Sequence, residues 1–397
     1  MKIRAIFTLI SAIAGFLFGG FTDIAQATEL EITNIRVGQG DATLIQGPTL
    51  ADGSRVNVLF DAGDRKSRDA GNIIRAVLAK KKIRTLDYVI ISHFDADHIG
   101  GIAFGPNHGR SFILGFNDEP GADGDDDGDG QIGWLDGFKC EKPDPDELGR
   151  GDDIRVLNWV DRGDVARKKN KGIAKYLAFT EAMGKRIRLD TQDEIDTYEI
   201  DLGLGATMKS MAGNGWVRGQ IKKVSSVNTE NERSLSFLVN YKQFDFLVSG
   251  DMIGRSYGSE NAKVEEAVGR ALKEEGVMLE VLHVNHHGGN NGSSAEFLNL
   301  VKPRIAVISA GNGNSHKHPH NDVLKRLHDA GVDRVIQTAW GRTANRVPDD
   351  VRNIHAIYQS DVSIKSDGRT YDIFTSRSFL TNRNKQPARK LSRVDCT

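Results

Sequence analysis

Short runs of apolar and β-branched residues alternate with turns along the first quarter of the chain. Strands are predicted at Glu31–Val37, Ala42–Gln46 and Val56–Asp61, because glycine-containing turns separate these runs. A helical pattern follows at Asn72–Lys82, and a mainly apolar strand at Leu86–Ile91 comes next. This order predicts a sheet that is covered by a helix.

The same alternation returns in the second half of the chain, after about residue 205. The predicted elements are strands at Ser234–Tyr241, Phe244–Ser249, Leu279–Val284, Arg304–Ser309 and Val335–Thr338, helices at Asn261–Glu275, Ser294–Val301 and Asn321–Ala330, and a closing hairpin around Ser366-Asp367-Gly368. Two strand-rich halves, each finished by helices, predict an α/β fold in which two sheets pack face to face. Helices would cover the outer faces, which gives a four-layer αββα sandwich.

A long stretch between the two halves, about 104–205, breaks the pattern and is interpreted as an insertion. Glycine, aspartate and proline dominate its first part, and lysine and arginine its second part. A solvated loop followed by a solvated helix explains this composition. A basic face that steers an anionic substrate is the alternative.

The chain has 397 residues, of which 39% are hydrophobic and 27% charged, so it is long and apolar enough to fold around a sizeable core. The formal net charge is −1, which gives no global attraction to nucleic acid or to a membrane surface.

The first residues predict export. Basic MKIR precedes an uncharged run from Ala5 to Thr22 and the small-residue pattern Ala25-Gln26-Ala27, which together are typical of a cleaved signal peptide over 1–27. A retained membrane anchor is the alternative. We expect a folded domain over 28–397 in the periplasm or outside the cell, with no membrane span after cleavage. There, Cys140 and Cys396 would either form one disulfide or stay free.

Four candidate metal ligands stand within six residues at the end of the strand Leu86–Ile91. They are His93, Asp95, Asp97 and His98 in the segment His93-Phe94-Asp95-Ala96-Asp97-His98. Imidazole nitrogens and carboxylate oxygens are ligands that divalent ions accept, and alternating residues in an extended turn can point toward two neighbouring ions. The segment therefore predicts a dinuclear metal site.

This segment resembles the HxHxDH signature of metallo-β-lactamase-fold hydrolases, with Asp95 in place of the second histidine. Its HxDxDH form resembles the extracellular β-lactamase-like domain of ComEC competence proteins. Further matching pieces follow in family order: Val37-Gly38-Gln39-Gly40-Asp41-Ala42, Phe60-Asp61-Ala62-Gly63-Asp64, Ile99-Gly100-Gly101, Ser249-Gly250-Asp251, His286-His287-Gly288 and His318-Pro319-His320.

The resemblance implies two divalent ions, each with its own ligands. His93 and Asp95 would serve the first metal, and Asp97 and His98 the second. Because Asp95 replaces a histidine, the site is richer in oxygen, which favours manganese or magnesium beside zinc.

More distant ligands come from the same resemblance. Asp251, at the end of a strand, would bridge the two ions, and His287 would complete the second, although His286 could ligate instead or touch substrate. A mid-chain histidine that full members of the family carry is missing, so water, a substrate phosphate oxygen or a residue near Asn231–Ser234 would fill that position.

Supporting roles are expected for two further groups. Asp41, Asp61 and Asp64 would accept N–H bonds from the ligating imidazoles, although each could instead be an ordinary turn residue. The cluster 316–320 precedes a helix, and its His318 and His320 would bind phosphate or act as general acid, unless the cluster is a solvated basic turn. Asp97, His318 and His320 are the expected catalytic residues.

A second metal site is predicted inside the insertion. Residues 125–136 have the spacing of the twelve-position calcium loop, with glycine at position 6, and the expected ligands are Asp125, Asp127, Asp129, Gln131 and Asp136. Paired EF-hand helices are not indicated on either side. We expect a structural calcium ion, with an acidic loop as the alternative.

The chemistry that these features predict is hydrolysis by hydroxide held between two metals. Because the ComEC-like domain is implicated in degrading a DNA strand, a phosphodiesterase or nuclease is the first hypothesis. The alternatives are hydrolysis of a small ester, lactone or amide, and a binding protein that uses the fold without turnover.

Overall fold

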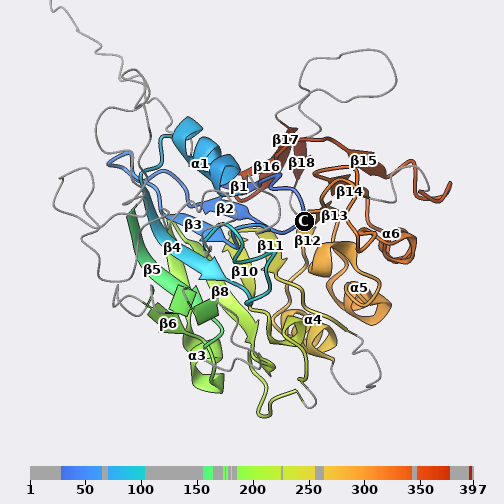
Figure 1. Ribbon diagram of the computed structural model, residues 1–397, viewed down its shortest axis with the longest axis horizontal. Helices are drawn as coiled ribbons and strands as arrows, with labels where there is room; N and C mark the ends of the chain where they lie inside the picture. The colour runs from blue at the N-terminus through green and yellow to red at the C-terminus, as the bar shows by residue number, and fades with distance from the viewer. Residues whose placement is uncertain are drawn as a thin grey trace, which may run out of the picture.

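The computed structural model describes residues 28–64, 70–102, 155–163, 173–174, 176–177, 180, 186–224, 227–254, 263–341, 347–375 and 393–395 (Figure 1). The predicted signal peptide 1–27, the predicted calcium loop 125–136 and both cysteines lie outside the described residues. Among the helices that are described, none is both long and apolar enough for a membrane crossing.

The first sheet combines the two ends of the described chain. Its strands, in spatial order, are β18 (Arg393–Asp395), β17 (Thr370–Thr375), β16 (Val362–Ser366), β1 (Leu30–Asn34), β2 (Thr43–Gln46), β3 (Asn57–Phe60), β4 (Thr85–Ile91), β5 (Arg155–Asp161) and β6 (Arg186–Arg188). Strands β3 to β6 are parallel to one another, and the other pairs are antiparallel. Ile32 on β1 lies opposite Ile364 on β16.

The second sheet is built from the middle and later parts of the chain. Its order is β15 (His355–Ile357), β14 (Arg334–Gln337), β13 (Ile305–Ile308), β12 (Val281–His283), β11 (Phe244–Ser249), β10 (Ser236–Tyr241), β8 (Ala206–Gly213) and β7 (Glu199–Gly203), with β9 (Trp216–Val217) beside β8. Strands β11 to β15 are parallel.

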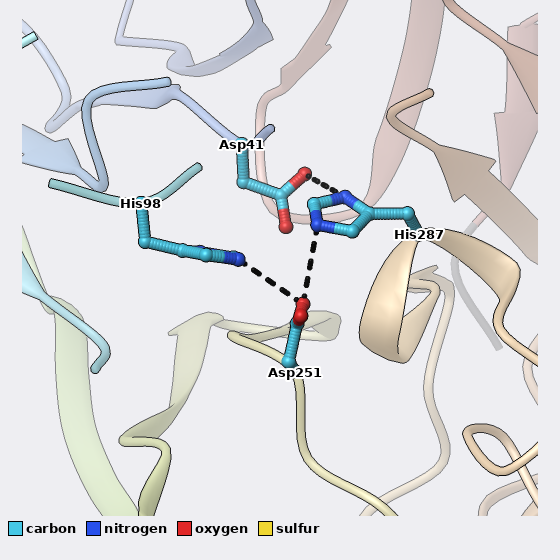
Figure 2. Close-up of side chains that lie close together, drawn as sticks. All are labelled: Asp41, His98, Asp251 and His287. Carbon is cyan, nitrogen blue, oxygen red and sulfur yellow. Dashed lines mark ion pairs between the residues drawn. The ribbon is translucent and has the colours of Figure 1, made fainter. Parts of the chain in front are cut away.

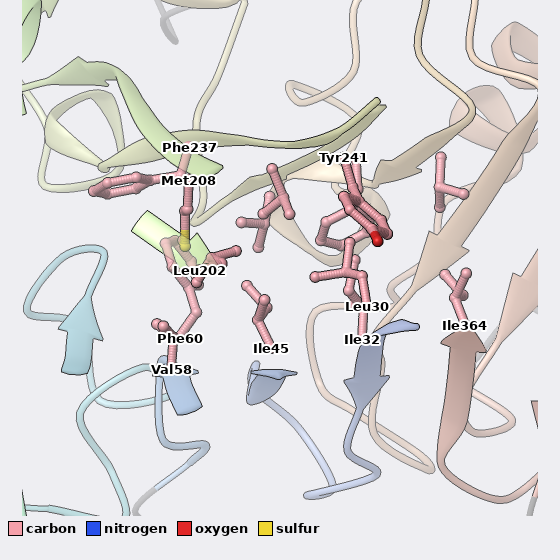
Figure 3. Packing of buried hydrophobic residues seen from close by; sticks show 14 of the residues in the cluster. Leu30, Ile32, Ile45, Val58, Phe60, Leu202, Met208, Phe237, Tyr241 and Ile364 are labelled. Carbon is pink, nitrogen blue, oxygen red and sulfur yellow. The ribbon is translucent and has the colours of Figure 1, made fainter. Parts of the chain in front are cut away.

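Buried side chains fill three layers between and around the sheets. Inward-facing residues of the first sheet, such as Ile45 and Phe60, meet Met208 and Phe237 of the second sheet (Figure 3). Burying each such side chain stabilises the fold by roughly 1.5–3 kcal/mol. This central layer holds the two sheets face to face.

Helices cover the outer face of each sheet (Figure 1). Helix α1 (Ala70–Lys80) packs Ile74 and Leu78, one turn apart, against the first sheet. The second sheet is covered by α4 (Val264–Glu274), α5 (Ala295–Val301) and α6 (Asn321–Asp329). The predicted four-layer αββα architecture is therefore confirmed.

Part of the predicted insertion belongs to the sheets. Strand β5 pairs along its length with β4, and β6, helix α3 (Gln192–Thr197) and β7 follow before residue 205. The buried residues of β5 are Val156, Trp159 and Val160. Arg155 and Asp161 bound this short apolar stretch, so composition alone predicts a loop there. Tertiary pairing overrides that local signal.

Candidate metal centre

Loops at the ends of parallel strands carry the predicted site residues. Strands β3 and β4 are parallel, as are β11 and β12, so the carboxyl ends of each pair lie at one edge of its sheet. Asp61 follows β3, the segment 93–98 follows β4, Asp251 follows β11, and His286 and His287 follow β12. Contacts between these loops build one site from both sheets.

Four buried residues from separate loops converge on one point (Figure 2). They are Asp41, His98, Asp251 and His287, and each offers one ligand atom within 4.8 Å of the others. Oδ1 of Asp251 lies 3.2 Å from Nε2 of His98 and 3.3 Å from Nε2 of His287. This spacing is suited to a cation between the groups.

Electrostatics favour positive charge at this point. Burial raises the pKa of Asp251, but His287, His286 and His98 together hold it well below its usual range. Burial lowers the pKa of His98, but the carboxylates of Asp251 and Asp61 raise it well above its usual range. The cluster therefore stabilises a cation among its carboxylates, whether a proton or a metal ion.

Buried atoms without hydrogen-bond partners test whether a metal fits. Within the described part of the chain, Nε2 of His93, His98 and His287 and Oδ1 of Asp251 are buried and make no hydrogen bond. Leaving a buried polar atom unpaired costs about 1–3 kcal/mol. Four such atoms beside one another are explained by metal coordination, so the residues present fit a divalent cation.

The rest of the HxDxDH segment lies around the same cluster. The rings of His93 and His98 are 4.1 Å apart between centroids, and Nε2 of His93 is 3.6 Å from Oδ2 of Asp95. Oδ2 of Asp97 is 3.4 Å from Nε2 of His287, and its Oδ1 is 3.9 Å from Nε2 of His98. All four predicted ligands of this segment are thus brought together.

The second oxygen of Asp251 faces a different imidazole. Oδ2 lies 3.5 Å from Nε2 of His286 and 3.4 Å from Nδ2 of Asn231, and Asn231 Nδ2 lies 3.2 Å from the same His286 nitrogen. Oδ1 of Asn291 accepts from Nδ1 of His286 at 2.7 Å, which leaves the lone pair on Nε2. Both histidines of the pair therefore point a nitrogen at Asp251.

An unusual backbone makes this double approach feasible. His286 and His287 have φ values of 54° and 52°, in the left-handed region that non-glycine residues rarely adopt. Gly288 continues with a φ of 77°, and a Cβ there would lie 2.7 Å from Cβ of Pro319. The glycine after the histidine pair is thus required by both conformation and space.

Asp61 and Ser92 orient the imidazoles of the HxDxDH segment. Oδ2 of Asp61 lies 2.8 Å from Nδ1 of His98, and the same carboxylate accepts from the backbone N–H and hydroxyl of Ser92, each at 2.7 Å. Oγ of Ser92 lies 3.0 Å from Nδ1 of His93. Sequence reasoning assigned no role to Ser92, although its place at the strand end before His93 was the available signal.

Asp41 lies on the other side of the cluster, but its two carboxylate oxygens are buried and accept no hydrogen bond from any described residue, so the predicted bond from a ligating imidazole is not formed. Its Oδ1 is 3.4 Å from Nδ1 of His287 and 3.4 Å from Nε2 of His283. The backbone carbonyl of Ser309 is 3.2 Å from the same His287 nitrogen. Asp64 is buried nearby, and its backbone N would be 2.8 Å from a Cβ on Gly40. His283 and Ser309 were not predicted as site residues.

Of the histidines in the cluster 316–320, which follows β13, the ring of His318 lies nearer the metal cluster than the ring of His320. The buried ring of His318 lies 5.2 Å from that of His286 and 5.9 Å from that of His287. His320 is further out: its ring is 5.5 Å from that of His318, and its Nε2 is 3.1 Å from the carbonyl oxygen of His316. It makes no side-chain bond to the first turn of α6.

Two features bear on substrate. Arg162 and Arg186, from the basic part of the predicted insertion, are buried in ion pairs with Glu230 and Asp161, so these two are structural. Trp340 is 41% exposed, and a Cβ on its neighbour Gly341 would lie 2.5 Å from the carbonyl oxygen of His318. An exposed aromatic residue therefore directly precedes the glycine that packs against the His318 backbone.

The two-sheet fold and the buried histidine and aspartate cluster define the class of this protein, and a family comparison agrees. Residues 35–110 match the model of the metallo-beta-lactamase superfamily. The segment 35–110 thus carries the pattern of that superfamily, and the chain is similar to competence proteins.

Three curated relatives illustrate that relation. ComE operon protein 3 of Bacillus subtilis (strain 168) is 23% identical over 79% of this chain and 32% of its own length. Recombination protein 2 of Haemophilus influenzae is 33% identical over 30% of this chain and 14% of its own. Competence protein ComA of Neisseria gonorrhoeae is 45% identical over 15% of this chain and 8% of its own. The chain thus spans less than a third of each relative.

Among solved structures, the MIM-2 metallo-beta-lactamase is similar with a TM-score of 0.28 and 14% identity, over 66% of this chain and 74% of that one.

Proposed function

We propose that this protein is a metal-dependent phosphodiesterase that acts on nucleic acid or a nucleotide. The observation that carries the proposal is the position of Asp251, whose Oδ1 faces His98 and His287 while its Oδ2 faces His286. A carboxylate with imidazoles at both oxygens is suited to hold two cations about 3.5–4 Å apart.

Each cation would have its own group of ligands. His93, Asp95 and His286 would hold the first, and Asp97, His98 and His287 the second, with Asp251 shared. This arrangement uses His286 where the mid-chain histidine is missing, and Asn231 stands beside it. The mixture of imidazole and carboxylate suits zinc or manganese, with magnesium as a third candidate.

Bound divalent cations supply activated water and neutralise negative charge on an ester under attack. The chain's own side chains keep the ligands oriented and meet the substrate. Asp61 accepts from His98, and Asp41 lies beside Nδ1 of His287. Burial and the neighbouring imidazoles lower the pKa of His318 to about 3, so the ring is neutral near pH 7 and suited to donate an N–H bond to a phosphate oxygen.

Two observations favour phosphodiesters over carboxylic esters. The donor set is rich in carboxylates, as suits cations that bind phosphate oxygens. The names of the curated relatives refer to competence and recombination, and recombination acts on DNA.

The experiment is a substrate panel with purified protein. Single- and double-stranded oligonucleotides, RNA, bis-p-nitrophenyl phosphate and a set of lactones are incubated with manganese, magnesium or zinc, and with a chelator. We expect cleavage of phosphodiesters that the chelator abolishes. Asp251→Asn should lose turnover and bound metal together, whereas Asp245→Asn, on the same strand β11 away from the cluster, should keep both. Turnover of lactones without any phosphodiester would contradict the proposal.

A further inference from the structure

A buried carboxylate outside the metal cluster holds the loop that carries two of its histidines. Glu265, in the first turn of α4, is completely buried. Its Oε1 accepts from Nδ2 of Asn285 at 2.7 Å and from the backbone N–H of Ser293 at 2.5 Å, and its Oε2 accepts from the backbone N–H of Ser294 at 2.8 Å. These three donors lie at the two ends of residues 285–294, here named the histidine loop.

Arg326 of α6 donates hydrogen bonds to backbone carbonyl groups of the same loop. Its Nε donates to the carbonyl oxygen of Ser293 at 3.0 Å, and its Nη2 donates to the carbonyl oxygens of Asn290 and Gly292 at 3.1 and 2.8 Å. The histidine loop is thus fixed by an anion that accepts from its donors and a cation that donates to its acceptors. Charged partners make such hydrogen bonds stronger than neutral ones.

The loop needs this support because its backbone is strained. His286, His287 and Ser293 are all in the left-handed region, with φ values of 54°, 52° and 49°. Such residues persist only where the surroundings hold them. Released from its partners, the loop would relax toward ordinary conformations and turn both imidazoles away from Asp251.

Glu265 also faces the loop that carries Asp251. A Cβ on Gly254, three residues beyond Asp251, would lie 2.5 Å from Oε2 of Glu265, and the Gly254 N–H donates to the oxygen of Asn291 at 3.0 Å. One carboxylate therefore packs against both of the segments that must meet at the metal centre.

We propose that Glu265 is a positioning residue that sets metal affinity by holding the histidine loop in its strained conformation. The proposal rests on the metal centre of the proposed function and extends it to a residue that touches neither metal nor substrate. Loss of a partner that orients a ligand typically lowers metal affinity about 10- to 100-fold. Glu265→Gln should fall in that range, because its amide NH2 group would face N–H donors.

The test measures metal affinity directly. Zinc and manganese are titrated into wild type, Glu265→Gln and Glu266→Gln in competition with a fluorescent chelator at pH 8. Burial raises the pKa of Glu265 to about 7, so the carboxylate is mainly ionised at that pH. Glu266 is the matched control, since it is also buried on α4 and its hydrogen bond with the histidine loop, from the Ser294 hydroxyl at 3.1 Å, can still be accepted by the amide oxygen of glutamine. We expect its variant to bind metal within about twofold of wild type, well short of the change expected for an orienting partner.

Two further readouts separate positioning from general destabilisation. Saturating metal should restore the turnover of Glu265→Gln with an unchanged KM, because the residue does not meet substrate. If Glu265→Gln does not fold, the metal affinity of Arg326→Lys is measured in its place. Arg326 is half-buried, and lysine cannot replace a guanidinium that donates to three carbonyl oxygens of the loop. The proposal is overturned if folded Glu265→Gln binds metal with wild-type affinity. If Glu265→Gln does not fold, wild-type metal affinity in Arg326→Lys overturns it. A wild-type protein that binds no metal overturns the metal centre itself.

Discussion

Asp61 and His98 are completely buried, and Oδ2 of the carboxylate lies 2.8 Å from Nδ1 of the imidazole. The contact joins the end of β3 to the end of the HxDxDH segment. Because Nδ1 is engaged by the carboxylate, Nε2 is left to face Asp251 at 3.2 Å.

Asp61→Asn should therefore weaken metal binding while leaving the fold intact. Asp61 has a φ of 59°, which asparagine tolerates, so the backbone needs no rearrangement. Loss of the charged acceptor should lower metal affinity about 10- to 100-fold. The measurement is metal content after dialysis against a series of buffered metal concentrations, with Asp52→Asn, an exposed turn residue, as control. Equal metal content in Asp61→Asn and wild type would contradict this role.

Trp340→Ala should impair cleavage of oligonucleotides selectively. If the substrate is a nucleic acid, the exposed indole of Trp340, which precedes the glycine that packs against the His318 backbone, is suited to stack on a base, and stacking contributes about 1–3 kcal/mol per base. We expect KM for a single-stranded oligonucleotide to rise about 5- to 100-fold, and KM for bis-p-nitrophenyl phosphate, which has no base, to stay unchanged. Leu204→Ala removes another exposed apolar side chain and should change neither value. A parallel loss on both substrates would count against stacking.

His355 should make the fold less stable in acid. Burial lowers its pKa to about 4, while an unfolded histidine titrates near 6.5, so the folded state favours the neutral ring. The stability that it contributes above pH 6.5 is lost as the pH falls toward 4, at no more than about 1.4 kcal/mol per pH unit.

Urea unfolding at pH 7.5, 6 and 5 tests the His355 prediction. His355→Gln can still bond to Gln337, the partner of its Nε2 at 2.9 Å, and should lose less stability than wild type between pH 7.5 and 5. His328→Gln, at an exposed position on α6, should follow wild type. Identical pH dependence in all three proteins would refute the prediction.

Calcium should stabilise the protein through the segment 125–136. The spacing of its acidic residues predicts one ion, with affinity in the range of about 10⁻⁴–10⁻³ M that is typical of extracellular modules. We expect millimolar calcium to raise the unfolding temperature of wild type and of Asp251→Asn, but not of the double variant Asp125→Asn, Asp129→Asn. Indifference of the wild-type unfolding temperature to calcium would remove this site.

The elements with regular periodicity were predictable from sequence, and so was the centre of the site. Strand Phe244–Ser249 matches β11 at both ends, because a short apolar run before Gly250-Asp251 leaves little ambiguity. The four candidate ligands of the HxDxDH segment lie within six residues, so their spacing alone predicts a metal site. Strand β5 was missed because its partners β4 and β6 are distant in sequence and its short apolar stretch is bounded by the charged residues Arg155 and Asp161.

The partners of the ligands were harder to predict than the ligands. Ser92 and Glu265 are ordinary residue types, and each gains its role from a contact between segments that are distant in sequence. Asn231 lies in the stretch that the sequence offered for the open metal position, but its contact with both Asp251 and His286 is visible only in the structure. The choice between His286 and His287 could not be made from spacing, because the left-handed backbone of both residues lets each reach a different oxygen of Asp251.

The pairing of β1 with β16 places an early and a late segment of the chain side by side in the first sheet, with Ile32 opposite Ile364. A growing chain that ends before β16 leaves one edge of β1 without its hydrogen-bonding partner. The sheet that presents His93 to His98 is therefore finished only when nearly all of the chain has been synthesised. Contacts so far apart in sequence form slowly. The edge of β1 therefore stays open for hydrogen bonding until β16 has been synthesised and has paired with it.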